Sequence, residues 1–218
     1  MSLEKPPQNL LKGYDTLILR YDVEMKVLIR WMLLLSAVFG LVACGFTTPP
    51  IISKPGTTTT IILVRHAERD PGLDPPLNSE GITRAVKLAE VLGQNGVTAI
   101  YATDYARNRQ TAEPLAIKLG LTVALIGSAE LGNTQSLAAR LGTEFLEKHA
   151  GGVVLLIGNV GSPAFGTNGI LADLYTLFGG TGNPPNRYQD MTIIVVPEAG
   201  KGSPNIIRTS YGAVSSLD

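Results

Sequence analysis

The residues with the clearest chemical potential are Arg65 and His66, which directly follow an apolar, β-branched run in the stretch IILVRHAERD. At neutral pH an imidazole can supply a nitrogen lone pair to phosphorus and form a phosphohistidine. That transfer requires cations on the phosphoryl oxygens, and guanidinium groups suit this task because they grip two oxygens and stay charged. Arg107, which follows a second apolar run, is another candidate cation. These residues predict phosphoryl chemistry at a local anion site.

Short β-branched runs alternate with segments of helical period from Thr59 onward. This alternation predicts an α/β fold, a single three-layer αβα domain with a mostly parallel sheet. The expected strands are 59–64, 97–102, 121–126, 153–157, 192–196 and 205–209. Most are continuous apolar runs, as expected for strands covered on both faces. The last two flank PEAGKGSPN and could form a hairpin, which would make the sheet mixed.

Apolar residues at helical spacing predict four helices between the strands. The first is marked by Ile82, Ala85, Val86, Ala89 and Leu92, the second by Ala112, Leu115, Ala116 and Leu119, the third by Leu137, Leu141 and Phe145, and the fourth by Ile170, Leu171, Leu174, Leu177 and Phe178. Asn78 or Ser79 is the expected cap of the first helix, and Gly120 suits the end of the second. Because parallel strands end at one edge of a sheet, Arg65, His66 and Arg107 are expected to meet there.

Composition excludes several classes of function. The chain has 18 Lys and Arg against 18 Asp and Glu, and the basic residues are scattered, so neither nucleic acid nor a polybasic membrane patch is indicated. A single cysteine excludes an internal disulfide framework, and two distant histidines disfavour a zinc cluster. We therefore expect no metal and no cofactor.

The segment 25–43 has the features of a secretory signal peptide, with Lys26 and Arg30 before an apolar stretch. Its last residues and Cys44, LVAC, resemble the lipobox of bacterial lipoproteins, which implies lipidation of Cys44 and an exported protein anchored to a membrane of the bacterial cell envelope. The apolar part is shorter than the roughly 20 residues of a spanning helix. The alternative is a chance cysteine that closes a short anchor or a buried helix.

After the signal peptide we expect a tether over 44–58, which is rich in proline and threonine, and then a folded domain over 59–218. Residues 1–24 form an N-terminal extension that fits poorly before a signal peptide. Met25 is an alternative start, and a cytosolic extension or a cloning remnant is the other explanation.

The stretches LVRHAE, PLNSEGITRAVKLAEVL and IYATDYARNRQTAEPLA together resemble the histidine phosphatase superfamily, which has the phosphoglycerate mutase-like fold. The resemblance runs over 59–211. It implies that His66 is the phosphorylated nucleophile and that Arg65 and Arg107 hold the phosphate. Arg109 is a weaker candidate, because its spacing from the following Thr-Ala pair does not match.

The family has a second histidine in its phosphate pocket, whereas this chain has Asn159 at that position, in LLIGNVGSP. An asparagine amide can donate to a phosphoryl oxygen, but it carries no charge and cannot shuttle a proton. The other histidine, His149, lies at the expected end of the third helix, where the helix dipole explains it. Glu130 is the candidate general acid, with a solvated loop glutamate as the alternative, and Glu68 is expected to orient the pocket.

Two functions remain open. The first is a membrane-anchored phosphatase that hydrolyses phosphomonoesters through phospho-His66 and is slowed or inactivated by Asn159. The second is a pseudophosphatase that binds a small phosphorylated ligand without turnover. A scaffold without a site is disfavoured because Arg65, His66 and Arg107 are all present. Short connections between the elements predict an open pocket, and no protein partner is indicated.

Overall fold

A computed structural model describes residues 51–161 and 168–215 of the chain. The predicted extension 1–24, the predicted signal peptide 25–43, Cys44 and residues 45–50 lie outside the described residues. Within the described ranges, no helix combines the length and the apolar character that a membrane crossing requires.

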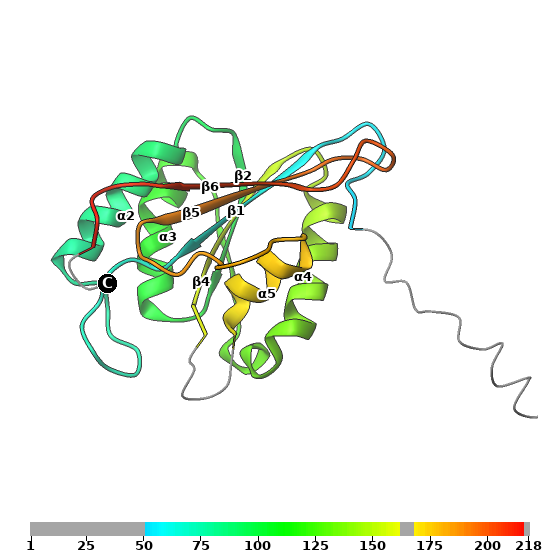
Figure 1. Ribbon diagram of the computed structural model, residues 1–218. Helices are drawn as coiled ribbons and strands as arrows, with labels where there is room; N and C mark the ends of the chain where they lie inside the picture. The colour runs from blue at the N-terminus through cyan, green and yellow to red at the C-terminus, as the bar shows by residue number, and fades with distance from the viewer. Residues whose placement is uncertain (1–50, 162–167, 216–218) are drawn as a thin grey trace, which may run out of the picture. The chain divides into compact units, whose positions relative to one another are not determined.

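Six strands form one mixed sheet in the order β3-β2-β4-β1-β5-β6 (Figure 1). The strands are β1 (Thr59–Arg65), β2 (Val97–Thr103), β3 (Val123–Ile126), β4 (Val153–Gly158), β5 (Asp190–Val196) and β6 (Asn205–Ser210). The first four are parallel, whereas β5 and β6 form an antiparallel hairpin beside β1. The predicted α/β class, the mostly parallel sheet and the hairpin are confirmed.

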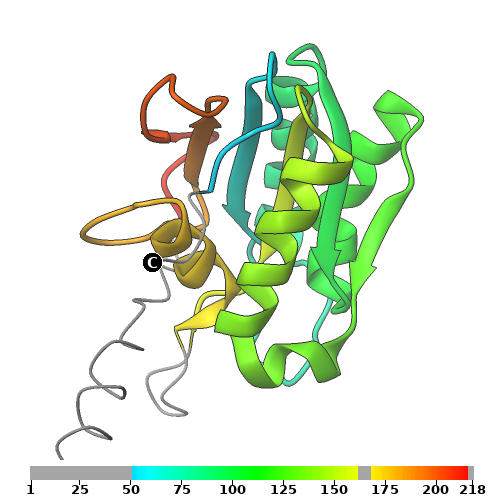
Figure 2. The same cartoon turned by 90° about the vertical axis from the view of Figure 1, so that its right-hand side faces the viewer.

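Helices cover both faces of this sheet, as Figures 1 and 2 show. They are α2 (Ser79–Leu92), α3 (Ala106–Leu119), α4 (Thr134–Lys148) and α5 (Gly169–Leu177), with a 3₁₀ turn, η1 (Ser128–Asn133), before α4. Alternate residues of β1 point to opposite faces. Ile62 and Val64 pack in one buried cluster with α2 and α3, while Ile61 and Leu63 pack in the other with α4 and α5. The three predicted layers follow from this alternation.

Local signals at the helix ends agree with the sequence. The side chain of Asn78 caps α2 and accepts a hydrogen bond from the backbone N–H of Gly81 at 2.9 Å. Gly120 ends α3 with φ of 65°, a left-handed conformation that other residues adopt only with strain.

Two parts of the apolar pattern do not correspond to the observed core. Ala85, Ala89 and Leu92 are buried in α2, as the apolar pattern predicts, and Leu88 is buried with them. Ile82 and Val86, which the same pattern places on the inner side, are 58% and 47% exposed. The difference arises because the buried stripe also includes a polar residue, Arg84, which an apolar pattern does not count. Likewise β3 is largely exposed, since it is an edge strand of the sheet.

The described part of the predicted tether, 51–58, lies against the domain. Ile51 packs on the apolar cluster beneath α4 and α5. The backbone N–H of Ser53 donates to the carbonyl oxygen of Pro197 at 2.9 Å, and its buried hydroxyl lies 2.5 Å from that of Thr59. The contacts of the folded part thus begin at Ile51, before the first strand.

Candidate active site

The strand order brings three chemically important positions to one edge of the sheet. His66 directly follows β1 and donates its backbone N–H to the carbonyl oxygen of Gly158, the last residue of β4, at 3.1 Å. Asn159 follows Gly158, and Arg107 lies in the first turn of α3, shortly after β2. Since β4 lies between β1 and β2, the segments that follow these strands converge.

The imidazole of His66 is 3% exposed and is held in one tautomer. Its Nδ1 lies 2.8 Å from the carbonyl oxygen of Ala67. A carbonyl oxygen only accepts, so Nδ1 carries the proton and Nε2 keeps the lone pair. Burial is the main cause that lowers the pKa of His66 to about 3, and the nearby charges of Arg107, Arg65 and Arg69 act in the same direction. The ring is therefore neutral at physiological pH, as a nucleophile must be.

The guanidinium of Arg107 is fixed between two side chains from distant parts of the chain. Its Nη1 forms an ion pair with Oδ1 of Asp74 at 3.2 Å, and its Nη2 donates to Oδ1 of Asn159 at 3.4 Å. The group also lies over the ring of Tyr105, 4.4 Å from the centroid. Its buried Nε has no hydrogen-bond partner among the described residues and remains available for an anion.

Arg65 and Arg69 add two further cations near His66. The guanidinium of Arg65 stacks over Tyr188 at 3.8 Å from the ring centroid, and its Nη1 donates to the carbonyl oxygen of Asn186 at 2.8 Å. Nη1 of Arg69 donates to the carbonyl oxygen of Asp70 at 2.9 Å, while the buried Nε of Arg69 has no partner in the described part of the chain. Arg69 thus joins the predicted cations Arg65 and Arg107, although no sequence pattern indicates it.

Asn159 lies in the site, but its amide is oriented by its neighbours. Its Oδ1 accepts from Arg107, and its Nδ2 donates to Oγ1 of Thr103 at 3.1 Å. The amide therefore presents an acceptor to the arginine and uses one of its two N–H groups on β2. In this arrangement Asn159 positions Arg107.

The remaining predicted residues lie apart from this cluster. The carboxylate of Glu130 forms an ion pair with Arg140 and accepts from the backbone N–H of Gly127 at 3.2 Å, within the turn that follows edge strand β3. His149 ends α4, just before β4 begins, so it lies at the opposite edge of the sheet from His66, with Nε2 2.9 Å from the Tyr101 hydroxyl. Arg109 forms an ion pair with Asp104.

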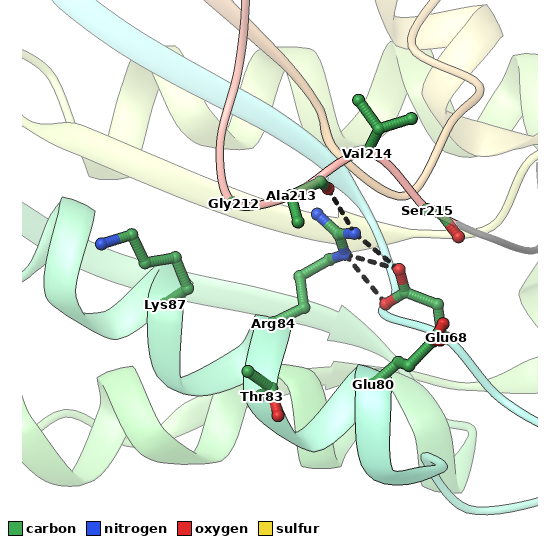
Figure 3. Close-up of a pocket in the computed structure, with 9 residues that line it drawn as sticks. All are labelled: Glu68, Glu80, Thr83, Arg84, Lys87, Gly212, Ala213, Val214 and Ser215. Carbon is green, nitrogen blue, oxygen red and sulfur yellow. Dashed lines mark hydrogen bonds and ion pairs between the residues drawn. The ribbon is translucent and has the colours of Figure 1, made fainter.

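Glu68 has an orienting contact rather than an exposed carboxylate. It is 1% exposed, and both of its oxygens lie 2.8 Å from Nε of Arg84 (Figure 3). Arg84 also donates to the carbonyl oxygens of Tyr211 at 3.0 Å and Ala213 at 2.8 Å. This buried pair connects the loop after β1 to α2 and to the C-terminal segment.

A cavity of about 570 Å³ adjoins the Glu68–Arg84 pair and is lined by residues of α2 and by residues 212–215. Figure 3 shows Glu80, Thr83 and Lys87 along its helical wall. His66, Arg65 and Arg107 are not part of its lining, so this cavity is distinct from the cation cluster.

Two residues of the cluster could not be selected from sequence patterns. Asp74 lies in the loop before α2, where no local pattern distinguishes it, yet it contacts Arg107, which lies 33 residues further along the chain. Arg69 lies three residues after His66, and this proximity was the one available signal. In the described ranges no group of three His, Cys, Asp or Glu side chains is arranged to hold a metal ion.

Comparisons with known proteins agree with the fold. A family model described as histidine phosphatase superfamily (branch 1) matches residues 61–131. The protein histidine phosphatase SixA complexed with tungstate is similar in structure, with 21% identity, a TM-score of 0.53, and coverage of 69% of this chain and 96% of that chain. Mycobacterial hydrolase 2 is similar over 74% of this chain and 94% of its own, with 21% identity and a TM-score of 0.50. No curated protein matches the chain significantly.

Proposed function

We propose that this chain, whose residues 61–131 match the histidine phosphatase superfamily (branch 1), hydrolyses phosphate monoesters through a phosphohistidine on His66. The observation that carries the proposal is the buried imidazole of His66, whose Nδ1 lies against the carbonyl oxygen of Ala67 so that Nε2 keeps its lone pair, near the charges of Arg65 and Arg107. The lone pair on Nε2 attacks phosphorus, the ester P–O bond breaks, and its electron pair leaves with the ester oxygen, which takes a proton from the general acid or from solvent to become the alcohol. Water then displaces the imidazole and releases phosphate.

The arginines supply the electrostatic part of this reaction. Phosphoryl transfer is accelerated mainly by positioning and by charge on the equatorial oxygens. In the proposed complex, Arg65, Arg107 and Arg69 hold those oxygens around His66. The SixA structure was obtained with tungstate, a tetrahedral oxyanion, which supports an oxyanion site in the same fold. We expect tungstate to inhibit this protein competitively.

We further propose that turnover is slow because Asn159 occupies a position from which an ionisable side chain could move a proton. Its amide neither accepts nor releases a proton at neutral pH, and its oxygen is directed at Arg107. Loss of one transition-state donor costs about a hundred- to a thousandfold in rate in comparable sites. Glu130 remains the proposed general acid, although its carboxylate is paired with Arg140 in this structure.

The alternative function is that of a pseudophosphatase, which binds a small phosphorylated ligand and does not turn it over. The contact between Asn159 and Arg107 favours this function. It holds the arginine in place for an anion, although position 159 carries an asparagine in place of a second histidine. In this case the cluster is an anion-binding site alone.

A lipid anchor on Cys44 completes the proposal. The basic start, the apolar stretch and the LVAC ending of 25–44 support an exported lipoprotein of the bacterial cell envelope. Replacing Cys44 by Ser should move the protein from the membrane fraction to the soluble fraction. Unchanged retention in the membrane fraction would refute the anchor.

Hydrolysis of p-nitrophenyl phosphate by the purified full chain separates the two functions. Slow turnover that disappears in His66→Ala, persists in His149→Ala and rises in Asn159→His supports the enzyme. His149 is the matched control, because it is the other histidine of the chain and lies at the opposite edge of the sheet. If the wild type and Asn159→His are both inert while phosphate raises the melting temperature, the binding function is supported instead.

A further inference from the structure

We propose that Asp74 is the general base that activates water for hydrolysis of the phosphohistidine at His66, an inference that rests on the proposed function. Asp74 lies in the loop between β1 and α2, and its carboxylate reaches the start of α3. Nothing in the sequence pattern marks it, because its contacts join residues more than thirty positions apart.

The carboxylate of Asp74 is fixed next to the arginine that would hold the phosphoryl group. Oδ1 lies 3.2 Å from Nη1 of Arg107 and accepts the backbone N–H of Ala106 at 2.9 Å, and Oδ2 lies 3.2 Å from the same N–H. The side chain is nevertheless 42% exposed, whereas that of Arg107 is 9% exposed. Because a carboxylate has about four acceptor positions, Asp74 can keep these contacts and still bind a water molecule.

The other polar side chains considered for proton transfer are less suited to this step. Asn159 cannot take a proton from water. Glu68 is 1% exposed and bonded through both oxygens to Arg84, and Glu130 is paired with Arg140 in the turn after the edge strand. His66 is itself the group that must leave.

The step balances without a further reactant. A water molecule transfers a proton to the Asp74 carboxylate while its oxygen forms the new bond to phosphorus. The bond between phosphorus and Nε2 of His66 breaks, and its electron pair returns to Nε2. Inorganic phosphate then departs, and Asp74 loses its proton to solvent through its exposed side.

This assignment also indicates a substrate class. Asp74 acts here as the proton acceptor of the second step, and Glu130, the proposed general acid of the first step, is paired with Arg140 in the turn after β3. Substrates whose leaving group departs without protonation are therefore favoured, and aryl phosphates should be turned over faster than alkyl phosphates.

The test isolates the second step. In the full chain, His149→Ala leaves His66 as the single histidine, which is then phosphorylated with phosphoramidate. Loss of the phosphoryl group is followed by intact-protein mass spectrometry. We expect Asp74→Asn, which preserves the acceptor for the Ala106 N–H, to slow this loss by about a hundredfold, because general bases contribute about a hundred- to ten-thousandfold. The rate of phosphorylation should change less than about threefold.

Two additional variants make the result specific. Asp104→Asn removes a comparable surface carboxylate, one paired with Arg109, and should leave both rates unchanged. In Asp74→Ala, added acetate should accelerate the loss of phosphate, which a merely structural role for Asp74 would not produce.

The inference is overturned if Asp74→Asn loses phosphate at the parent rate. It is also overturned if formation and loss slow together, since Asp74 would then act only by holding Arg107. A parent protein that forms no phosphohistidine, or releases phosphate no faster than free phosphohistidine, instead rejects the proposed function, and this inference with it.

Discussion

The buried neutral imidazole of His66 should make the stability of the domain depend on pH in a measurable way. The pKa of this group is lowered from 6.5 to about 3, chiefly by burial and further by the charges of Arg107, Arg65 and Arg69. As the pH falls below about 6.5, the unfolded chain binds a proton at His66 and the folded chain does not. The stabilising contribution is therefore complete above pH 6.5 and is lost progressively towards pH 3.

The magnitude follows from the two pKa values. For a single proton, a pKa difference of one unit corresponds to about 1.4 kcal/mol in the free energy of unfolding. The difference between the pKa of His66 in the unfolded and the folded chain therefore corresponds to several kcal/mol. Between pH 7 and pH 5, the loss assigned to His66 is about 2 kcal/mol. Solvent screens the charge of this group only weakly, because the His66 side chain is almost completely buried.

Urea unfolding of the wild type and His66→Gln at pH 7 and pH 5 measures this contribution. The wild type should lose about 2 kcal/mol more than the variant between the two pH values, because glutamine does not titrate. Other titrating groups, including His149 and Glu68, are present in both proteins and cancel in the difference. Equal losses in the two proteins would refute the assignment of a neutral, buried His66.

Three other perturbations have defined outcomes. Arg84→Met should lower the free energy of unfolding, measured with urea, by about 3–5 kcal/mol, because it leaves Glu68 charged and buried without its partner. Adding Glu68→Gln to this variant should recover a large part of the loss. Arg69→Gln should raise the KM for p-nitrophenyl phosphate about tenfold or more, because a charge-assisted hydrogen bond contributes about 1.5–3 kcal/mol, and an unchanged KM would exclude Arg69 from the site. Gly81→Ala should lower the free energy of unfolding by about 1–3 kcal/mol, because its Cβ would lie 2.1 Å from the carbonyl oxygen of Glu68. Gly132→Ala, which has open space around it, should be neutral in the same urea-unfolding assay.

Much of the fold could be predicted because its signals are local. Strand runs such as TTIILV and VVLLI are apolar over their whole length, since both faces of a central strand are covered. The cap at Asn78 and the left-handed Gly120 also depend only on neighbouring residues. The inner face of α2 was less predictable, because the buried Arg84 is stabilised by Glu68 and the C-terminal segment, which are distant in sequence.

In the candidate site, too, some features follow from local sequence and others from contacts between residues that are distant in sequence. The chain itself determined that His66 follows a buried strand with Arg65 beside it, and that Arg107 begins a helix after another strand. Only the tertiary structure decided that Asp74 contacts Arg107, that Arg69 joins the cluster, and that the Asn159 amide turns its oxygen towards Arg107. The physical reason is the strand order β2-β4-β1, which places loops far apart in sequence within hydrogen-bonding distance and which no local pattern specifies.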